Sequence, residues 1–181
     1  VRKDLIPKLA DQVMLKPNFL SNNNQLASSH ADAMRGAIDF LLSCPSPPSE
    51  ILIAEGGNED RSGECFDNFG YPSLIDEYEV EIRLIDLNQE TEWETCTAYL
   101  HDRSEYQVHM PKTVLDCPCT ISVAIAKTHD VCCVTLALKN MIMGKFAEMA
   151  EANSGQAAGS SSADTENSND CLLYTSPRPR A

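Results

Sequence analysis

The amino-acid sequence predicts an α/β fold, in which a mostly parallel sheet carries helices on both of its faces. Segments with strand character alternate along the chain with segments whose apolar residues recur at helical spacing. The strand segments are continuous apolar runs, which is typical of parallel strands that are buried on both faces. These two observations together predict the fold class.

The first strand and the first helix lie near the amino-terminal end. Residues 12–19 contain a short apolar run that ends at Pro17, whose ring nitrogen cannot donate to a neighbouring strand. Over residues 30–42 the apolar side chains form a stripe at helical spacing, and either Ser28 or Ser29 is placed to cap this helix. A proline-rich stretch then ends the helix.

The middle of the chain supplies further strands. Residues 50–54 and 81–88 are apolar runs that predict the second and third strands, with a helix over 72–78 between them. Residues 92–100 and 104–110 show the alternation of half-exposed strands, which predicts a hairpin or an excursion at the sheet edge.

The last predicted strand and helix are joined by polar residues. Residues 120–125 predict a buried strand, and residues 131–143 predict a helix that follows it. Asp130 is placed to cap that helix. A helix N-terminus is positively polarised, so together with Lys127 it favours a phosphate or a carboxylate.

Length, charge and hydropathy limit the function. A chain of 181 residues is enough for one domain with a substantial core. A net charge of −13 argues against nucleic acid as a partner, because nucleic acid needs a basic face. No run of about 18 apolar residues is present to span a membrane. The chain begins at Val1 without a recognisable signal peptide, so we expect a cytoplasmic protein.

The chain contains eight cysteines, and their spacing resembles no small disulfide framework. No two cysteines are separated by two residues, and no four-cysteine ferredoxin run is present. We therefore expect reduced and mostly buried thiols. The alternative is a soft metal site whose ligands would be Cys117, Cys119, Cys132, Cys133 and His129.

Polar residues follow each predicted strand at its carboxyl end, which is where parallel sheets bind ligands. In an acidic protein, lysines at these positions would suit an anionic ligand. They are equally expected as solvated strand ends or as partners of carboxylates. The residues are Lys16 and Asn18, Glu55 and Gly56, Asp86 and Asn88, and Lys127 and His129.

Two residues near the last strand are candidates for acid–base chemistry. A histidine such as His129, with an ordinary pKa of about 6.5, suits proton transfer or metal ligation, and it also suits a plain cap or surface hydrogen bond. Lys139 lies among apolar neighbours, where a lowered pKa would make it a nucleophile or a base. The simpler interpretation, which we favour, is that Lys139 extends along the helix to solvent and has no chemical role.

Residues 147–181 differ in composition from residues 1–146, which we take as one α/β domain. From Glu151 to Asp170 there is no large apolar side chain, so this segment is predicted to be disordered. Residues 171–181 resemble the translated read-through of a sequencing adapter, and we give them no functional role.

The ordered set of motifs resembles the family called domain of unknown function 362. The motifs are V-M-L-K-P-N-F, E-I-L-I-A-E-G-G-N, I-R-L-I-D-L-N, M-P-K-T-V-L-D-C and A-K-T-H followed by T-L-A-L-K-N, within residues 10–145. Besides the strand-end residues, the resemblance singles out Lys112 in the P-K motif and Lys139 and Asn140 in the K-N motif.

Members of that family usually continue into a second half, so the resemblance implies a carboxyl-terminally truncated fragment with an incomplete second half of the fold. Some members carry an appended iron–sulfur module, which implies a redox or electron-transfer association and a ferredoxin-like partner or module. This chain carries no such cysteine-rich module. The resemblance therefore supports no iron–sulfur cluster within the chain and leaves the cofactor unknown.

The function that these observations favour is the binding of a small anionic ligand at the strand-end loops. His129, Lys127 and Lys139 are the candidate catalytic residues, although no motif names a reaction or decides whether the chain is an enzyme. The alternatives are a non-catalytic metal or iron–sulfur accessory protein and an inactive fragment. The candidate ligand-binding residues are Lys16, Asn18, Glu55, Gly56, Asp86, Asn88, Lys112 and Asn140.

Overall fold

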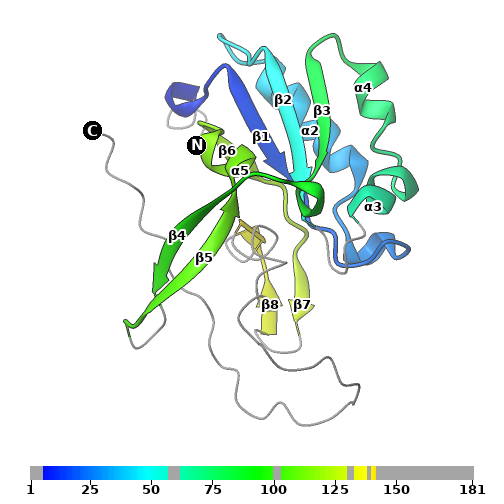
Figure 1. Ribbon diagram of the computed structural model, residues 1–181. Helices are drawn as coiled ribbons and strands as arrows, with labels where there is room; N and C mark the ends of the chain where they lie inside the picture. Colours follow the sequence, from blue (N-terminus) through cyan, green and yellow to red (C-terminus); the bar gives the residue numbers. More distant parts are fainter. Residues whose placement is uncertain (1–5, 57–61, 100–102, 130–132, 138–139, 142–181) are drawn as a thin grey trace.

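The computed structural model describes residues 6–56, 62–99, 103–129, 133–137 and 140–141 (Figure 1). Four parallel strands form the central sheet in the order β3-β2-β1-β6, which confirms the predicted α/β fold with its parallel sheet. The strands are β1 (Gln12–Lys16), β2 (Glu50–Glu55), β3 (Glu81–Asp86) and β6 (Thr120–Ser122).

Strand β1 lies inside the sheet, between β2 and β6. Leu15 pairs with Ile53 of β2 on one side and with Ile121 of β6 on the other. Val13, Met14 and Leu15 are completely buried, because neighbouring elements cover both faces of the sheet. This double burial is the physical reason for the continuous apolar run that predicts the strand.

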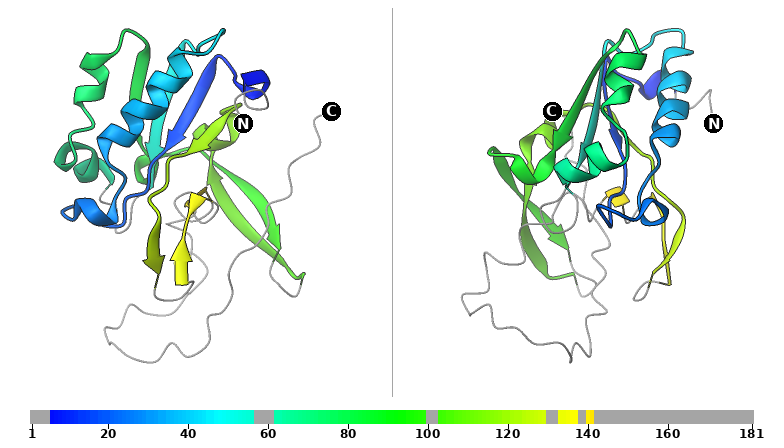
Figure 2. Two further views of the ribbon diagram at one scale, coloured as in Figure 1. Left: turned by 180° about the vertical axis from the view of Figure 1, so that it is seen from behind. Right: turned by 90° about the vertical axis from the view of Figure 1, so that its right-hand side faces the viewer.

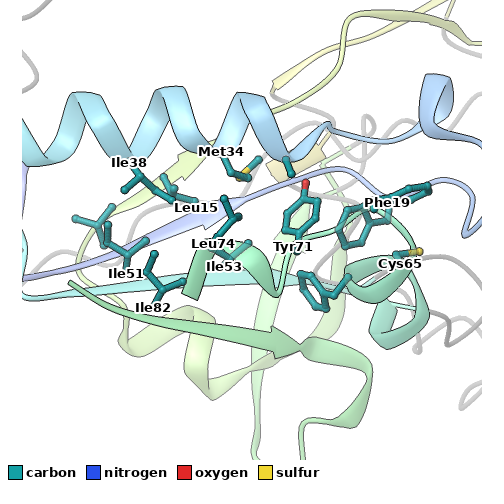
Figure 3. Close-up of a cluster of buried hydrophobic side chains, with 14 of the residues drawn as sticks. Leu15, Phe19, Met34, Ile38, Ile51, Ile53, Cys65, Tyr71, Leu74 and Ile82 are labelled. Atoms are coloured by element: carbon teal, nitrogen blue, oxygen red, sulfur yellow. The ribbon is translucent and has the colours of Figure 1, made fainter. Parts of the chain in front are cut away.

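One face of the sheet is covered by α2 (Ala31–Leu42), α3 (Ser62–Asn68) and α4 (Ser73–Glu77) (Figures 1 and 2). Helix α2 places Met34 and Ile38 over this face, as their spacing of one helical turn predicts. Leu74 of α4 joins the same core, whose side chains are drawn in Figure 3. The helices therefore bury the apolar residues that alternate onto one side of β1 and β2.

Aromatic rings close this core near the carboxyl ends of the strands. Phe19 packs edge-on against Phe66 and against Tyr71, with ring centroids 5.1 and 5.2 Å apart. The Tyr71 hydroxyl points from the core toward the chain before α2 and donates to the Ser29 carbonyl at 2.9 Å (Figure 3). The ring thus fills the core while its polar end ties down the loop that precedes α2.

The opposite face is covered by the antiparallel hairpin of β4 (Trp93–Tyr99) and β5 (Glu105–Pro111), followed by the short helix α5 (Lys112–Asp116) (Figure 2). Val108 and Met110 of β5 and Val114 of α5 pack with Met14 of β1. The hairpin predicted from the alternating pattern is confirmed. Short 3-10 helices lie at Ile6–Lys8 (η1), Gln25–Ala27 (η2) and Leu87–Gln89 (η4).

Helix α2 begins as predicted, but its cap is a different residue. His30 is the N-cap, and its Nδ1 atom accepts from the backbone N–H of Asp32 at 3.1 Å. The prediction of Ser28 or Ser29 as the cap is therefore wrong. Both serines are buried and bond to other loops, because the chain turns inward just before the helix.

The structure differs from the sequence prediction after Ser122. The strand predicted over 120–125 is shorter and half-buried, because β6 pairs with β1 alone among the described strands. The helix predicted over 131–143 is wrong at its start, since β7 (Lys127–His129) and β8 (Cys133–Thr135) form an antiparallel hairpin. β-Branched residues such as those of β8 favour strands over helices.

The correction removes one argument for an anion site. Because Cys133–Thr135 is a strand, the helix predicted from Val131 does not run through these residues, and the described residues directly after β7 supply no positively polarised helix N-terminus. Asp130, the predicted cap, lies outside the described residues. Among the residues described after β8, Ala137, Asn140 and Met141 are helical. In the described part of the chain, no helix combines the length and the apolar character needed to cross a membrane.

Candidate functional site

Lys16 and Glu55 end neighbouring strands and form a buried ion pair. The register pairs Leu15 with Ile53, so β1 ends at Lys16 and β2 ends at Glu55 at the same carboxyl edge of the sheet. The Lys16 Nζ atom contacts the Glu55 Oε2 atom, and the two side chains are 0% and 2% exposed. The other Glu55 oxygen accepts from the Phe19 backbone N–H at 3.4 Å. Each charge is thus compensated by a partner rather than by water.

Asn140 connects this ion pair to the end of β6. Its Oδ1 atom accepts from Lys16 Nζ at 3.4 Å, and its Nδ2 atom donates to the Lys16 carbonyl at 3.1 Å. The same Nδ2 atom donates to Ser122 Oγ at 3.0 Å. The buried amide therefore uses both its donor and its acceptor to hold β1 and β6 together beyond their last ladder bonds.

A second group of hydrogen bonds surrounds Asn18, Ser29 and Lys127. The Lys127 ammonium donates to Asn18 Oδ1 at 2.7 Å and to the Ala27 carbonyl at 2.5 Å. Ser29 Oγ accepts from the Asn18 backbone N–H at 3.0 Å and donates to the Val123 carbonyl at 2.6 Å. These bonds join the loop after β1 to the segment between β6 and β7.

We call these residues the strand-end cluster. They come from the ends of β1, β2 and β6, from the loop before α2, and from the segments after β6. In the described residues no buried side-chain nitrogen or oxygen lacks a hydrogen-bond partner, so the cluster is internally satisfied. Its members are Lys16, Asn18, Ser29, Glu55, Ser122, Lys127 and Asn140.

The electrostatics of the cluster are dominated by burial. Burial raises the pKa of the Glu55 carboxyl, and the Lys16 ammonium opposes that rise by its charge and its hydrogen bond. Lys127 also acts on Glu55 through its charge, in the same direction as Lys16. The described members of the cluster include two lysines, Lys16 and Lys127, and one carboxylate, Glu55.

Residues on the β3 side of the cluster have a different character. Burial raises the pKa of the Cys65 thiol to about 11, with smaller contributions from Glu55, Glu64 and Asp86. Burial also raises the pKa of Tyr71. Both groups are therefore held in their neutral forms near neutral pH. They belong to the packing of this edge rather than to proton transfer.

Gly56 and Asp86 lie beside the cluster. Gly56 is buried directly after Glu55, where a residue without a side chain lets other groups approach the backbone. Asp86 pairs with Glu55 in the β2–β3 register. Its carboxylate accepts from the backbone N–H groups of Gly63 and Asn88, at 3.2 and 3.0 Å. Asp86 and Asn88 thus hold the turn after β3.

Lys112 is not joined to the cluster by its described contacts. Its side chain is exposed and forms a salt bridge with Glu92 at 3.0 Å. The Glu92 carboxylate raises the pKa of Lys112. Lys112 therefore fits the interpretation in which a lysine at the end of an apolar run pairs with a carboxylate. Its partner, Glu92, lies at the base of the β4–β5 hairpin.

The side chains of two of the three candidate catalytic residues lie outside the described part of the structure. Lys139 lies outside the described residues. The backbone of His129 is in β7, and its side chain is outside the description. Lys127 is therefore the candidate whose environment is known, and it is half-buried beside Asn18.

Cys117 and Cys119, two candidate ligands of the alternative metal site, pack in different cores. Cys117 packs with the core beneath the β4–β5 hairpin, whereas Cys119 packs with the core beneath α2. Both precede β6 at the amino edge of the sheet, whereas β7 follows its carboxyl edge. Among the residues described, no group of three or more His, Cys, Asp or Glu side chains could hold a metal ion. Cys132 lies outside the description, as does the side chain of Cys133.

Sequence reasoning missed Ser29 and Ser122 as members of the cluster. Ser122 is the last residue of β6, and the rule that selects polar residues at strand ends would have found it. Ser29 gave no comparable signal, because a serine before a helix is most simply a cap. Its bond to Val123 depends on a contact between residues far apart in the sequence.

Comparison with known proteins gives one match. The model of the family described as Domain of unknown function (DUF362) matches residues 13–168. Neither a curated protein nor a solved structure matches the chain. The matched range contains every member of the strand-end cluster.

Proposed function

The chain belongs to the DUF362 family, and from this premise and the geometry of its sheet edge we propose that it binds a small anionic ligand at the strand-end cluster. The observation that carries the proposal is the charge of the cluster. Two lysines, Lys16 and Lys127, lie in the cluster at the carboxyl edge of the sheet, in a chain whose net charge is −13.

The position of the cluster supports the same proposal. Ligands of open parallel sheets bind outside the carboxyl ends of the strands, and the cluster is built from the ends of β1, β2 and β6. Lys127 is half-buried, so a charge there is less screened than one on the open surface. The buried Gly56 adds a stretch of backbone that a ligand can approach closely.

The ligand would take the place of hydrogen bonds that the protein now makes to itself. Two of the partners of the Lys127 ammonium are neutral acceptors, Asn18 Oδ1 and the Ala27 carbonyl. A hydrogen bond from an ammonium to an anion is about twice as strong as a bond between neutral groups. An anion is therefore able to compete for the ammonium, and Asn18 would be released to donate through its amide.

The test compares the whole chain with the variants Lys127→Gln and Lys112→Gln. The second variant is the matched control, because it removes an exposed lysine that pairs with Glu92 outside the cluster. Acetate and inorganic phosphate are added at constant ionic strength, and the midpoint of thermal unfolding is measured. We expect at least one anion to raise the midpoint of the wild type and of Lys112→Gln, but not that of Lys127→Gln.

Two results would contradict the proposal. One is that neither anion changes the midpoint of the wild-type chain. The other is that the Lys127→Gln and Lys112→Gln variants respond equally, since binding at the cluster requires the Lys127 charge. Chemical-shift mapping then provides the location, because the amides of Asn18 and Gly56 should respond first.

A further inference from the structure

Two cysteines separated by a single proline lie in the connection between α5 and β6, at the amino edge of the sheet (Figure 1). Cys117 and Cys119 are free thiols, and both side chains are half-buried beside the exposed proline. Cys44 and Cys65, in contrast, are buried in the core. A reagent in solvent can reach a half-buried thiol, so this pair is open to chemistry that the buried cysteines are not.

The sulfur of the first cysteine lies against the backbone of the second. The Cys117 thiol donates to the Cys119 carbonyl, with 3.3 Å between sulfur and oxygen. The same carbonyl accepts from the Met14 backbone N–H at 2.8 Å, so the pairing of β6 with β1 fixes this part of the backbone. The Cys117 sulfur is therefore held beside the residue that carries the second sulfur.

The two thiols also interact through charge. Burial raises the pKa of the Cys119 thiol, and the charge of Cys117 raises it further, whereas a hydrogen bond with the Ala10 backbone lowers it. Conversion of Cys117 into a neutral disulfide would remove one of the two contributions that raise this pKa. Reaction at Cys117 would therefore make Cys119 easier to ionise, and a thiolate is the form that attacks a disulfide.

We propose that Cys117 and Cys119 form a thiol–disulfide exchange site for small disulfides. The Cys117 thiolate attacks one sulfur of a disulfide RSSR, forms a mixed disulfide and releases the first RS⁻. The Cys119 thiolate then attacks the Cys117 sulfur, closes the Cys117–Cys119 disulfide and releases the second RS⁻. The small disulfide gains two electrons and the cysteine pair loses two, while the two thiol protons pass to solvent or to the released thiolates.

The disulfide formed in this way should be easily reversed. A disulfide stabilises a protein less when it closes a shorter loop, and this bridge spans a single residue. Cys117 packs against the core beneath the β4–β5 hairpin and Cys119 against the core beneath α2, so bridging them takes at least one sulfur out of its packing. Both effects favour the dithiol. Labile disulfides of this kind serve catalysis or redox regulation rather than stability.

The test incubates the reduced whole chain with oxidised glutathione, alkylates the remaining thiols and measures the mass of the peptide that contains residues 117–119. We expect the wild-type peptide to lose two hydrogen atoms without gaining glutathione, and to regain them in excess reduced glutathione. Cys119→Ser should retain glutathione on Cys117. Cys117→Ser should react at least about tenfold more slowly, because a thiol with a raised pKa contains little thiolate.

Cys96→Ser is the matched control, because Cys96 is a half-buried free thiol that packs against the same core as Cys117. It should close the disulfide as the wild type does. The thermal unfolding midpoint of each variant shows whether it is folded, and the wild-type measurement tests the proposal even where a variant is not.

Three results would overturn the proposal. The wild-type peptide could stay unreacted or keep glutathione without closing the disulfide. The variants Cys117→Ser and Cys119→Ser could gain glutathione at equal rates. The control Cys96→Ser could lose the reaction, which would make Cys96 the partner. The pair lies at the opposite edge of the sheet from the strand-end cluster, so none of these results bears on the proposed binding of an anion.

Discussion

The Lys16 ammonium and the Glu55 carboxylate are in direct contact at the end of two neighbouring strands, shielded from solvent on all sides. Neither charge has access to water, so each depends on the other for its compensation. Asn140 and the Pro17 carbonyl accept from the remaining protons of the ammonium, at 3.4 Å each. The ion pair is therefore fixed by its own contacts, and the half-buried Lys127 and its neighbours lie in the same cluster.

Removing one partner of this ion pair should lower the free energy of unfolding far more than removing both partners together. Lys16→Met leaves Glu55 buried without a cation, so we expect the free energy of unfolding to fall by about 3 kcal/mol. Glu55→Met should lower the free energy of unfolding by a similar amount, because it leaves Lys16 buried without an anion. The double variant Lys16→Met with Glu55→Met should cost no more than either single change. Urea unfolding of all four proteins gives the coupling energy, and simple additivity of the two costs would show that the pair does not act as a unit.

The stability of the protein should depend on pH through Glu55. Burial raises its folded-state pKa above the ordinary value of 4.5, so its contribution is fully present below that pH. The contribution is lost as the pH rises through the folded pKa. Relative to Glu55→Gln, the wild type should therefore lose stability as the pH rises. Urea unfolding of both proteins from about pH 4 to about pH 8 measures this difference.

Glu50 provides a control of opposite sign for the pH experiment. Hydrogen bonds from Gln12 and from Arg83 lower the pKa of Glu50, so its contribution is present above the ordinary value of 4.5 and is lost as the pH falls. Relative to Glu50→Gln, the wild type should gain stability with rising pH. If the Glu55 comparison shows the same slope as the Glu50 comparison, the attraction of Lys16 outweighs burial.

Ser29 should contribute to stability through the two backbone groups that its hydroxyl satisfies. Ser29→Ala leaves the Asn18 N–H and the Val123 carbonyl without this partner, so we expect a loss of about 1–3 kcal/mol. Ser43→Ala is the control, because Ser43 is exposed at the end of α2 and should change stability by less than about 0.5 kcal/mol. If Ser29→Ala and Ser43→Ala lose equal stability in thermal or urea unfolding, water has taken over the hydrogen bonds that the Ser29 hydroxyl makes.

Two glycines should respond in opposite directions to alanine. Gly36 is exposed inside α2, and a Cβ atom there would meet nothing within 4 Å, so Gly36→Ala should stabilise the protein by about 0.5–1 kcal/mol. Gly70 has a φ of +73°, so Gly70→Ala should destabilise it by about 1–2 kcal/mol although space is available. A shift of both unfolding midpoints in the same direction would contradict this backbone explanation.

The central sheet was predictable from the sequence because its strands are buried on both faces. Continuous apolar runs marked β1, β2 and β3, and simple alternation marked the β4–β5 hairpin. The helix predicted after β7 was wrong at its start, because a short apolar run such as Cys133–Thr135 has no periodicity that separates a strand from a helix. In this case β-branched composition was the better guide.

The candidate site was predictable in position but not in its contacts. The rule of strand ends found Lys16, Glu55 and Lys127, because parallel strands share one carboxyl edge. That Lys16 binds Glu55 depends on the pairing of β1 with β2 and on the side-chain contact at their ends, which the sequence does not contain. The sequence also did not show that Lys112 pairs with Glu92, because the β4–β5 hairpin brings these two residues together. The redox association that the family resemblance implies stays a prediction.

The order of the strands in the sheet sets the order in which this protein can be assembled during synthesis. Strand β1 emerges first and meets β2 and β3 early, but its other edge waits for Thr120–Ser122. Until then an apolar strand edge is open to pairing with other chains. Asn140 arrives later still to complete the surroundings of Lys16. A ribosome-bound chain that ends before Asn140 should therefore hold a sheet in which the buried Lys16 lacks one of its partners.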